Sequence, residues 1–329
     1  MSLEARLVAC WYSRRGWCFI LIPLSWLFGL VSRLRRRLYA WCPAQRLPVP
    51  VIVVGNLAVG GTGKTPLVLW LVDRLRAAGH RPGVVSRGYG ASADTALEVG
   101  PDGDPASLGD EPVLLARRAG CPVWVGRRRR EAGLGLLEAH PEVDVIVADD
   151  GLQHYGLARD MEIVVVDGRR GFGNGLLLPA GPLREGRSRL ASVDAVVVNG
   201  GGSLADVAVP SYNMQLAGER LYNLHEPSRR VAPGHFAGQS VHAVAAIGHP
   251  ERFFDALARQ GIQVIPHSFP DHHRFLPVDL PAGNVIMTEK DAVKCAAFGR
   301  DDLWVYAVDA VVSEGLEQQV LDKLDSCHG

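Results

Sequence analysis

A glycine-rich stretch directly after an apolar run is the feature that most limits how this chain can fold. The run is PVIVVGN (50–56), and the stretch is AVGGTGKTP (58–66). Glycines let the backbone turn so that several N–H groups point at one phosphate, Lys64 can reach the terminal phosphates, and the Thr65 hydroxyl can hold Mg²⁺. The pattern predicts a strand, a phosphate-binding loop and a helix, in that order.

The residues expected to bind a nucleotide are Gly60, Gly61, Thr62, Gly63, Lys64 and Thr65. The generic pattern G-x-x-x-x-G-K-[ST] has glycine where this chain has Ala58, and Gly60 and Gly61 supply the flexibility instead. A dinucleotide-binding loop is disfavoured, because Pro66 stands where its third glycine would fall. Val59 replaces the extra lysine of partitioning-type ATPases, which favours nucleotide use within one subunit. The remaining alternative is a helix-capping turn that binds nothing.

Short β-branched runs alternate with longer helical patterns after residue 48, as in βαβ units of a parallel sheet. Five further strands of a first domain are expected at 81–88, 121–126, 143–150, 161–168 and 193–200. A polar region follows to about residue 235 and is expected to hold a linker or a hairpin. A second α/β unit is indicated by 241–248, a helix at 249–261, and the segments 284–293 and 303–312. The expected division is 1–47, 48–205 and 206–329.

The amino terminus carries an uncharged apolar run, WCFILIPLSWLFGLVS (17–32), with Arg14 and Arg15 before it. Four arginines follow it, at positions 33, 35, 36 and 37. About 16 residues are fewer than the roughly 20 that a spanning helix needs, which favours a helix lying in one leaflet with arginines on anionic headgroups. A true span, a core helix and a signal peptide are the alternatives.

Bulk composition excludes some classes of protein. The 329 residues are 47% apolar with a formal net charge of zero, so there is no global positive field for non-specific nucleic-acid binding. The six cysteines contain no C-x-x-C pair and no regular spacing, which indicates neither a zinc site nor a disulfide framework. A two-domain α/β enzyme in a reducing compartment is expected.

Acidic side chains stand where phosphoryl-transfer chemistry would need them. Asp149 and Asp150 close a buried strand, where a carboxylate can meet the metal held by Thr65. Successive strand residues face opposite ways, so at most one of the two is expected to touch the ion. Asp110 and Glu111 form a further pair in SLGDEP, which alone would be an ordinary surface turn. FPDHHRF (269–275) holds a histidine pair that could assist a carboxylate acting as a base.

Basic residues cluster at 127–130 and at Arg184, Arg187 and Arg189. Such runs are usually solvated faces, although fixed arginines also suit a phosphorylated substrate.

Several motifs together resemble the tetraacyldisaccharide 4'-kinase family. They are VGNLAVGGTGKTP, VVSRGYG, GDEP, ADDGLQH, LPAGPLRE, the DHH of FPDHHRF, and MTEKDAVK, in the family's order over nearly the whole chain. The resemblance implies a P-loop NTPase-type parallel sheet core, a smaller C-terminal α/β lid domain and an N-terminal membrane-associated helix. It implies transfer of the γ-phosphate of ATP to the 4'-hydroxyl of a tetraacyldisaccharide 1-phosphate at the cytoplasmic face of the bacterial inner membrane.

The resemblance also suggests roles for individual residues. Asp110 is the expected base and His272 its partner, Asp150 is catalytic, and Thr65 and Asp149 hold Mg²⁺. Supporting residues are Glu111, Gln153, His154, Arg184 and Glu185. The expected partners are the lipid substrate and the membrane surface, with no nucleic acid and no obligate protein partner. A membrane-tethered regulatory ATPase and a nucleotide-binding adaptor without chemistry are the alternatives.

Overall fold

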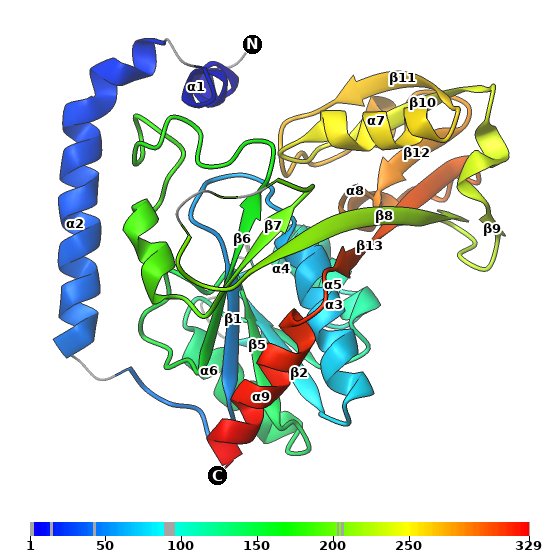
Figure 1. Cartoon of the computed structure of the whole chain (residues 1–329). Helices are drawn as coiled ribbons and strands as arrows, with labels where there is room; N and C mark the ends of the chain where they lie inside the picture. The colour runs from blue at the N-terminus through cyan, green and yellow to red at the C-terminus, as the bar shows by residue number, and fades with distance from the viewer. Residues whose placement is uncertain are drawn as a thin grey trace.

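A single mixed sheet runs through the whole molecule. The structure is a computed structural model that describes residues 3–13, 16–41, 44–88, 96–202, 204 and 207–328. Its strand order is β11-β10-β12-β13-β8-β7-β6-β1-β5-β2-β4-β3, with β9 paired to β8 (Figure 1). The strands are β1 (Val51–Gly55), β2 (Pro82–Ser86), β3 (Leu97–Glu98), β4 (Val123–Val125), β5 (Val145–Asp149), β6 (Met161–Asp167), β7 (Ala195–Asn199), β8 (Ser211–Asn223), β9 (Arg230–Val231), β10 (Ser240–Ala245), β11 (Gln263–Ser268), β12 (Val285–Thr288) and β13 (Leu303–Val312). The α-helices are α1 (Leu3–Trp11), α2 (Ile22–Trp41), α3 (Lys64–Ala77), α4 (Pro105–Leu108), α5 (Asp110–Arg118), α6 (Arg129–Ala139), α7 (Pro250–Arg259), α8 (Glu289–Cys295) and α9 (Leu316–His328).

The first half of the sheet is the predicted parallel core. β1 pairs in parallel with β5 on one side and with β6 on the other, and every residue of these three strands is buried. Continuous apolar runs suit strands that are covered on both faces. α3, α5 and α9 supply side chains to the core cluster on one face, and α6 supplies Ala132 and Leu136 to the cluster on the other. The predicted P-loop NTPase-type α/β class is confirmed.

Two long strands carry the sheet into the C-terminal half. β8 pairs in parallel with β7 at its start and antiparallel with β13 along most of its length. The region expected to hold a linker or a hairpin holds the 13-residue strand β8, which forms an antiparallel hairpin with β9 at its far end. β10, β11 and β12 add in parallel, with α7 and α8 packed beside them. After β13 the chain returns to the first half, where α9 packs on α3.

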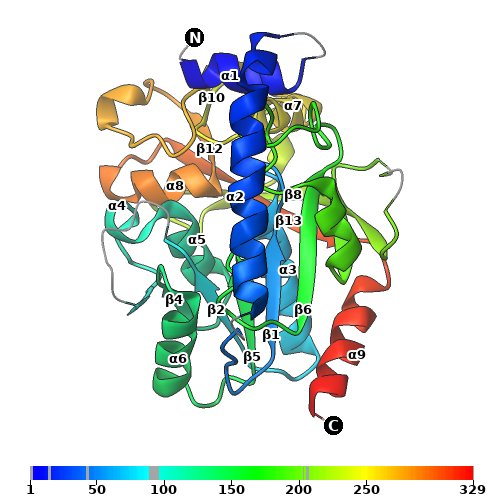
Figure 2. The same ribbon diagram turned by 90° about the vertical axis from the view of Figure 1, so that its left-hand side faces the viewer.

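The N-terminal helix α2 lies along the outside of the core (Figures 1 and 2). Ser25 donates a hydrogen bond to the Leu177 carbonyl (2.7 Å), and a side chain at Gly29 would collide with Leu177. The opposite face is apolar and exposed, with Trp26 72%, Leu30 61% and Trp41 87% accessible. Within the described residues, Trp17–Tyr39 is long and apolar enough to cross a membrane by length and composition.

A disulfide joins Cys10 of α1 to Cys18 in the short 3₁₀ helix that precedes α2. The cysteine spacing did not predict this pairing. The Cα atoms of the two residues lie 6.1 Å apart. Cys42 and the flanking Arg14 and Arg15 lie outside the described residues, as do Tyr89 and Gly90 of the VVSRGYG motif.

Candidate active site

The phosphate loop is held open by two buried asparagines. The Asn56 amide donates to the Ala58 carbonyl (2.7 Å) and to the Thr62 hydroxyl (3.3 Å), and the Asn199 amide donates to the Thr62 carbonyl (2.9 Å). Gly63 has φ 92° and lies so close to Asn199 that a Cβ would stand 2.3 Å from its amide nitrogen. Glycine is required here on both counts. α3 begins at Lys64, with Thr65 in its first turn.

Lys64 meets the second of the two predicted strand-end acids. Its Nζ lies 3.3 Å from Oδ1 of Asp150, and Arg184 donates from Nη1 to the same carboxylate at 3.2 and 3.3 Å. Burial acts to raise the pKa of Asp150, but Lys64 and Arg184 outweigh it and hold the pKa at about 2. Asp150 also adopts φ 47°, a left-handed conformation that is uncommon for non-glycine residues.

Asp149 points to the other side of the strand, into the protein. Its Oδ2 accepts a hydrogen bond from the Ser86 hydroxyl (3.2 Å), whereas its buried Oδ1 makes no hydrogen bond within the described part of the chain. Burial, together with the carboxylate of Glu111, raises the pKa of Asp149 above its ordinary range. A buried carboxylate oxygen without a partner is suited to a cation.

Asp110 and His272 touch across the two halves of the molecule. Asp110 begins α5 directly after Gly109, whose φ of 94° sets the turn, and Nδ1 of His272 lies 3.0 and 3.1 Å from the two carboxylate oxygens. Burial acts to raise the pKa of Asp110, but the His272 hydrogen bond and the ammonium groups of Lys290 and Lys294 lower it overall. The Asp110 hydrogen bond raises the pKa of His272, which adopts φ 60°.

Lys290 of α8 contacts the acidic residues next to Asp110 and His272. Its Nζ lies 3.0 Å from Oε1 of Glu111 and 3.2 Å from Oδ1 of Asp271. Burial acts to lower the pKa of Lys290, but the three surrounding carboxylates raise it overall. Lys290 therefore stays charged and holds the loop that carries His272 against the start of α5.

Two other predicted supporting residues, Gln153 and Glu185, contact each other next to Asn56. Gln153 donates to the Asn56 carbonyl (3.0 Å) and to Oε2 of Glu185 (3.3 Å), and Tyr155 donates to Oε1 of Glu185. His154 instead lies behind the site, where Nε2 accepts from the Arg129 backbone N–H (3.3 Å). Burial, with nearby Arg129 and Arg159, lowers the pKa of His154 to about 4.

The C-terminal half also touches the phosphate loop directly. A Cβ on Gly248 would stand 2.8 Å from the Gly61 nitrogen, so only glycine allows this approach. Arg170 donates to the Gly248 carbonyl (3.2 Å) and lies over the ring of Tyr12 near the N-terminus, 5.0 Å from its centre. The loop therefore lies where all three parts of the chain meet.

Several residues of this site were not predicted individually. Ser86, Asn199 and Lys290 come from three different strand ends or helices, and sequence spacing gives no sign that they converge. Arg129 is fully buried under β5, where it donates to the Asp149 and Gly126 carbonyls, although the run 127–130 suggested a solvated face. Asn56 had a usable signal, because a polar residue ends an otherwise apolar strand just before the loop.

Comparison with known proteins shows the family of this chain. The family LpxK, described as Tetraacyldisaccharide-1-P 4'-kinase, matches residues 17–325. The chain belongs to this family. Relatives named tetraacyldisaccharide 4'-kinase include proteins of Azoarcus sp. (strain BH72), 53% identical over 97% of this chain and 95% of the relative, and of Chromobacterium violaceum, 53% identical over 97% and 98%.

A solved structure has the same fold. The crystal structure titled "apo" form LpxK from Aquifex aeolicus in complex with ATP superposes with a TM-score of 0.81 and 28% sequence identity. The match covers 94% of this chain and all of that one. The family assignment suggested by the sequence motifs is confirmed.

Proposed function

We propose that this member of the tetraacyldisaccharide 4'-kinase family transfers the γ-phosphate of ATP to the 4'-hydroxyl of a tetraacyldisaccharide 1-phosphate. The observation that carries the proposal is the contact between Asp110 and His272, in a protein whose phosphate-loop Lys64 is paired with Asp150 together with Arg184. A regulatory ATPase would not need a buried base that reaches across two halves of the molecule.

Phosphate recognition falls to the loop and to two cations. The backbone N–H groups of Gly60 to Thr65 would surround the β- and γ-phosphates of ATP, and Lys64 and Arg184 would pair with their oxygens. Asp150 holds both cations in place before the nucleotide arrives. This arrangement reduces the reorganisation needed when the phosphoryl group moves.

The acceptor hydroxyl would be activated by Asp110. The oxygen of the acceptor hydroxyl forms a bond to the γ-phosphorus, and the bond between that phosphorus and the β,γ-bridging oxygen breaks. The hydroxyl proton passes to the Asp110 carboxylate, and ADP leaves. A weak base is sufficient, because in a loose transition state proton transfer is needed only late. His272, backed by Lys290, keeps the carboxylate oriented and ionised.

Magnesium suits the residues present, because Oδ1 of Asp149 is buried without a hydrogen-bond partner in the described chain and Ser86 fixes the other oxygen. Asp149 and the Thr65 hydroxyl would hold it. A bound Mg²⁺ supplies charge neutralisation at the phosphate oxygens.

The proposal extends to location and partners. Residues 1–47 would hold the enzyme on the cytoplasmic face of the bacterial inner membrane, 48–205 would bind the nucleotide, and 206–329 would include the lid. The exposed apolar face of α2 supports a helix lying on the bilayer, since its other face is packed along the core. The partners are the lipid substrate and the membrane surface, with neither nucleic acid nor an obligate protein.

The test is transfer of labelled γ-phosphate from Mg-ATP to a tetraacylated glucosamine disaccharide 1-phosphate in detergent micelles. We expect labelled lipid with the wild type and none with Lys64→Ala. Asp110→Asn should lower turnover at least about 100-fold with little change in ATP affinity, as for loss of a general base. Wild-type protein that binds ATP but labels no lipid would overturn the function, and near-normal turnover of Asp110→Asn would remove only the base.

A further inference from the structure

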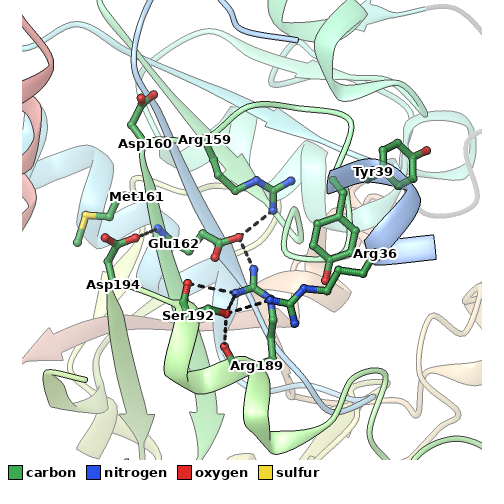
Figure 3. A pocket seen from close by; sticks show the side chains of 10 residues that line it. Arg36, Tyr39, Arg159, Asp160, Met161, Glu162, Arg189, Ser192 and Asp194 are labelled. Carbon is green, nitrogen blue, oxygen red and sulfur yellow. Dashed lines mark hydrogen bonds and ion pairs between the residues drawn. The ribbon is translucent and has the colours of Figure 1, made fainter. Parts of the chain in front are cut away.

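A pocket of about 390 Å³ lies between the C-terminal half of α2 and the core (Figure 3). Its floor includes Met161, the first residue of β6, whereas the phosphate loop follows the last residue of β1. These two strands are parallel, so the pocket and the nucleotide site lie toward opposite ends of the sheet. The pocket is therefore separate from the phosphate loop, although Tyr155 both lines it and donates to Glu185.

Three arginines line this pocket, and two of them share one carboxylate. Arg189, only 4% exposed, donates from Nη2 to Oε1 of Glu162, and Arg159 donates to the same oxygen at 3.0 Å. The buried Nε of Arg189 makes no hydrogen bond within the described residues, and Oε2 of Glu185 stands 4.0 Å away. Arg36 reaches in from α2 and donates to the Ser192 hydroxyl at 3.2 Å.

The two other acids of the pocket each form an ion pair with a cation that does not line it. Asp160 pairs with Arg46 (2.9 Å) and accepts from the Val51 backbone N–H. Asp194 pairs with Lys323 (3.3 Å) and accepts from the Glu162 backbone N–H. Arg159 and Arg189 share Glu162, and Arg189 also lies within ion-pair distance of Glu185. Within the described residues Arg36 bonds to Ser192 and to no carboxylate, so the pocket keeps one cation without an acidic partner and favours an anion.

The position of Arg36 on α2 indicates where that anion comes from. Ser25, Gly29 and Arg36 follow one another at helical spacings of four and seven, so all three lie on the face turned to the core. The outward face carries the exposed Trp26, Leu30 and Trp41. A helix is about 10 Å across, so with this face in the acyl region of a leaflet, the core-facing side lies at the level of the headgroup phosphates.

We propose that this pocket binds the phosphate of an anionic membrane phospholipid, with Arg36 on its oxygens and its acyl chains beside the outer face of α2. Arginine holds phosphate through two parallel hydrogen bonds, which an ammonium group cannot reproduce. The bound lipid clamps α2 to the core and fixes the orientation of the enzyme on the bilayer. This inference does not depend on the kinase activity.

The test compares two charge-conserving variants of adjacent exposed arginines, Arg36→Lys and Arg37→Lys. Arg37 is on the same turn of α2 but does not line the pocket. Binding of the full chain is measured on phosphatidylcholine vesicles with and without phosphatidylglycerol, after equal melting temperatures show that both variants fold. We expect Arg36→Lys to bind anionic vesicles about fivefold or more weakly than wild type, because the planar fork is lost, while Arg37→Lys is unchanged.

Two outcomes would overturn the proposal. Equal binding by both variants would mean that the arginines act only through general surface charge. A rise in the melting temperature of the wild type, but not of Arg36→Lys, with inorganic phosphate alone, and no preference for anionic vesicles, would assign the pocket to free phosphate instead.

Discussion

Asp110 is subject to opposing influences that decide its ionisation. Burial favours the neutral acid, whereas His272, Lys290 and Lys294 favour the carboxylate and prevail, so its pKa is lowered. Since His272 gains the same hydrogen bond, its own pKa is raised. The left-handed backbone at His272 is needed to present the ring to Asp110, and the contact offsets the cost of that conformation.

The stability contributed by this pair should depend on pH in a defined window. The contribution of Asp110 is present above its ordinary pKa of 3.8 and is lost as the pH falls through the lowered value. The contribution of His272 is complete below 6.5 and is lost as the pH rises through the raised value. We expect His272→Gln, which keeps a donor but no charge, to lower the melting temperature most between pH 3.8 and 6.5. If the melting temperature of His272→Gln lies below that of the wild type by the same amount up to alkaline pH, the imidazole does not form an ion pair with Asp110.

Among the elements, those predicted from the sequence are the ones whose pattern is local. β1, β2, β5, β6 and β7 are continuous apolar runs, and burial on both faces dictates that pattern. The long strand β8 was not predicted, because it mixes polar and apolar residues and its path is set by pairing with β13. Gly218 in β8 shows this dependence, because a Cβ there would lie 2.1 Å from the Tyr306 hydroxyl of β13.

The candidate site divides in the same way. The phosphate loop is one segment whose chemistry can be inferred from its spacing. The contact between Asp110 and His272 joins residues 162 positions apart and depends on how α5 packs on α8. Spacing alone could not predict that contact, and only the family resemblance suggested it.

At the level of α2, membrane association should depend on the outward face. Leu30 is 61% exposed, so Leu30→Glu should leave the melting temperature unchanged. Vesicle binding should weaken at least about tenfold, because the variant can no longer bury this leucine side chain in the bilayer. Val278→Glu is the matched control, because Val278 is 85% exposed but belongs to the C-terminal half. Equal binding by the two variants in a flotation assay would count against α2 as the anchor.

Over the whole molecule, several polar contacts hold the C-terminal half against the first half, and the sheet runs through both halves. Arg252 of α7 lies 2.6 Å from Oδ1 of Asp167, at the end of β6, and Arg170 bonds to Gly248. The β8–β13 ribbon is the continuous connection, and its register shifts between Ala307 and Asp309. The ladder is bent and irregular at this shift, so any separation of the two halves is expected to occur there.

Removing the Arg252 contact should therefore favour the open arrangement. Asp167 is 4% exposed. The free energy of a hydrogen bond from a charged group to such a buried acid is enough to change the equilibrium constant between the closed and open forms about tenfold. We expect Arg252→Gln to reduce kcat/KM by about that factor, with Arg259→Gln on the last turn of the same helix as control. Scattering should show a larger radius of gyration for Arg252→Gln alone, and saturating ATP analogue should restore the compact form, because a ligand in the cleft favours closure by mass action. If the radius is unchanged while activity falls, Arg252 acts on Asp167 and the adjoining Arg170 locally, and the two halves do not separate at this contact.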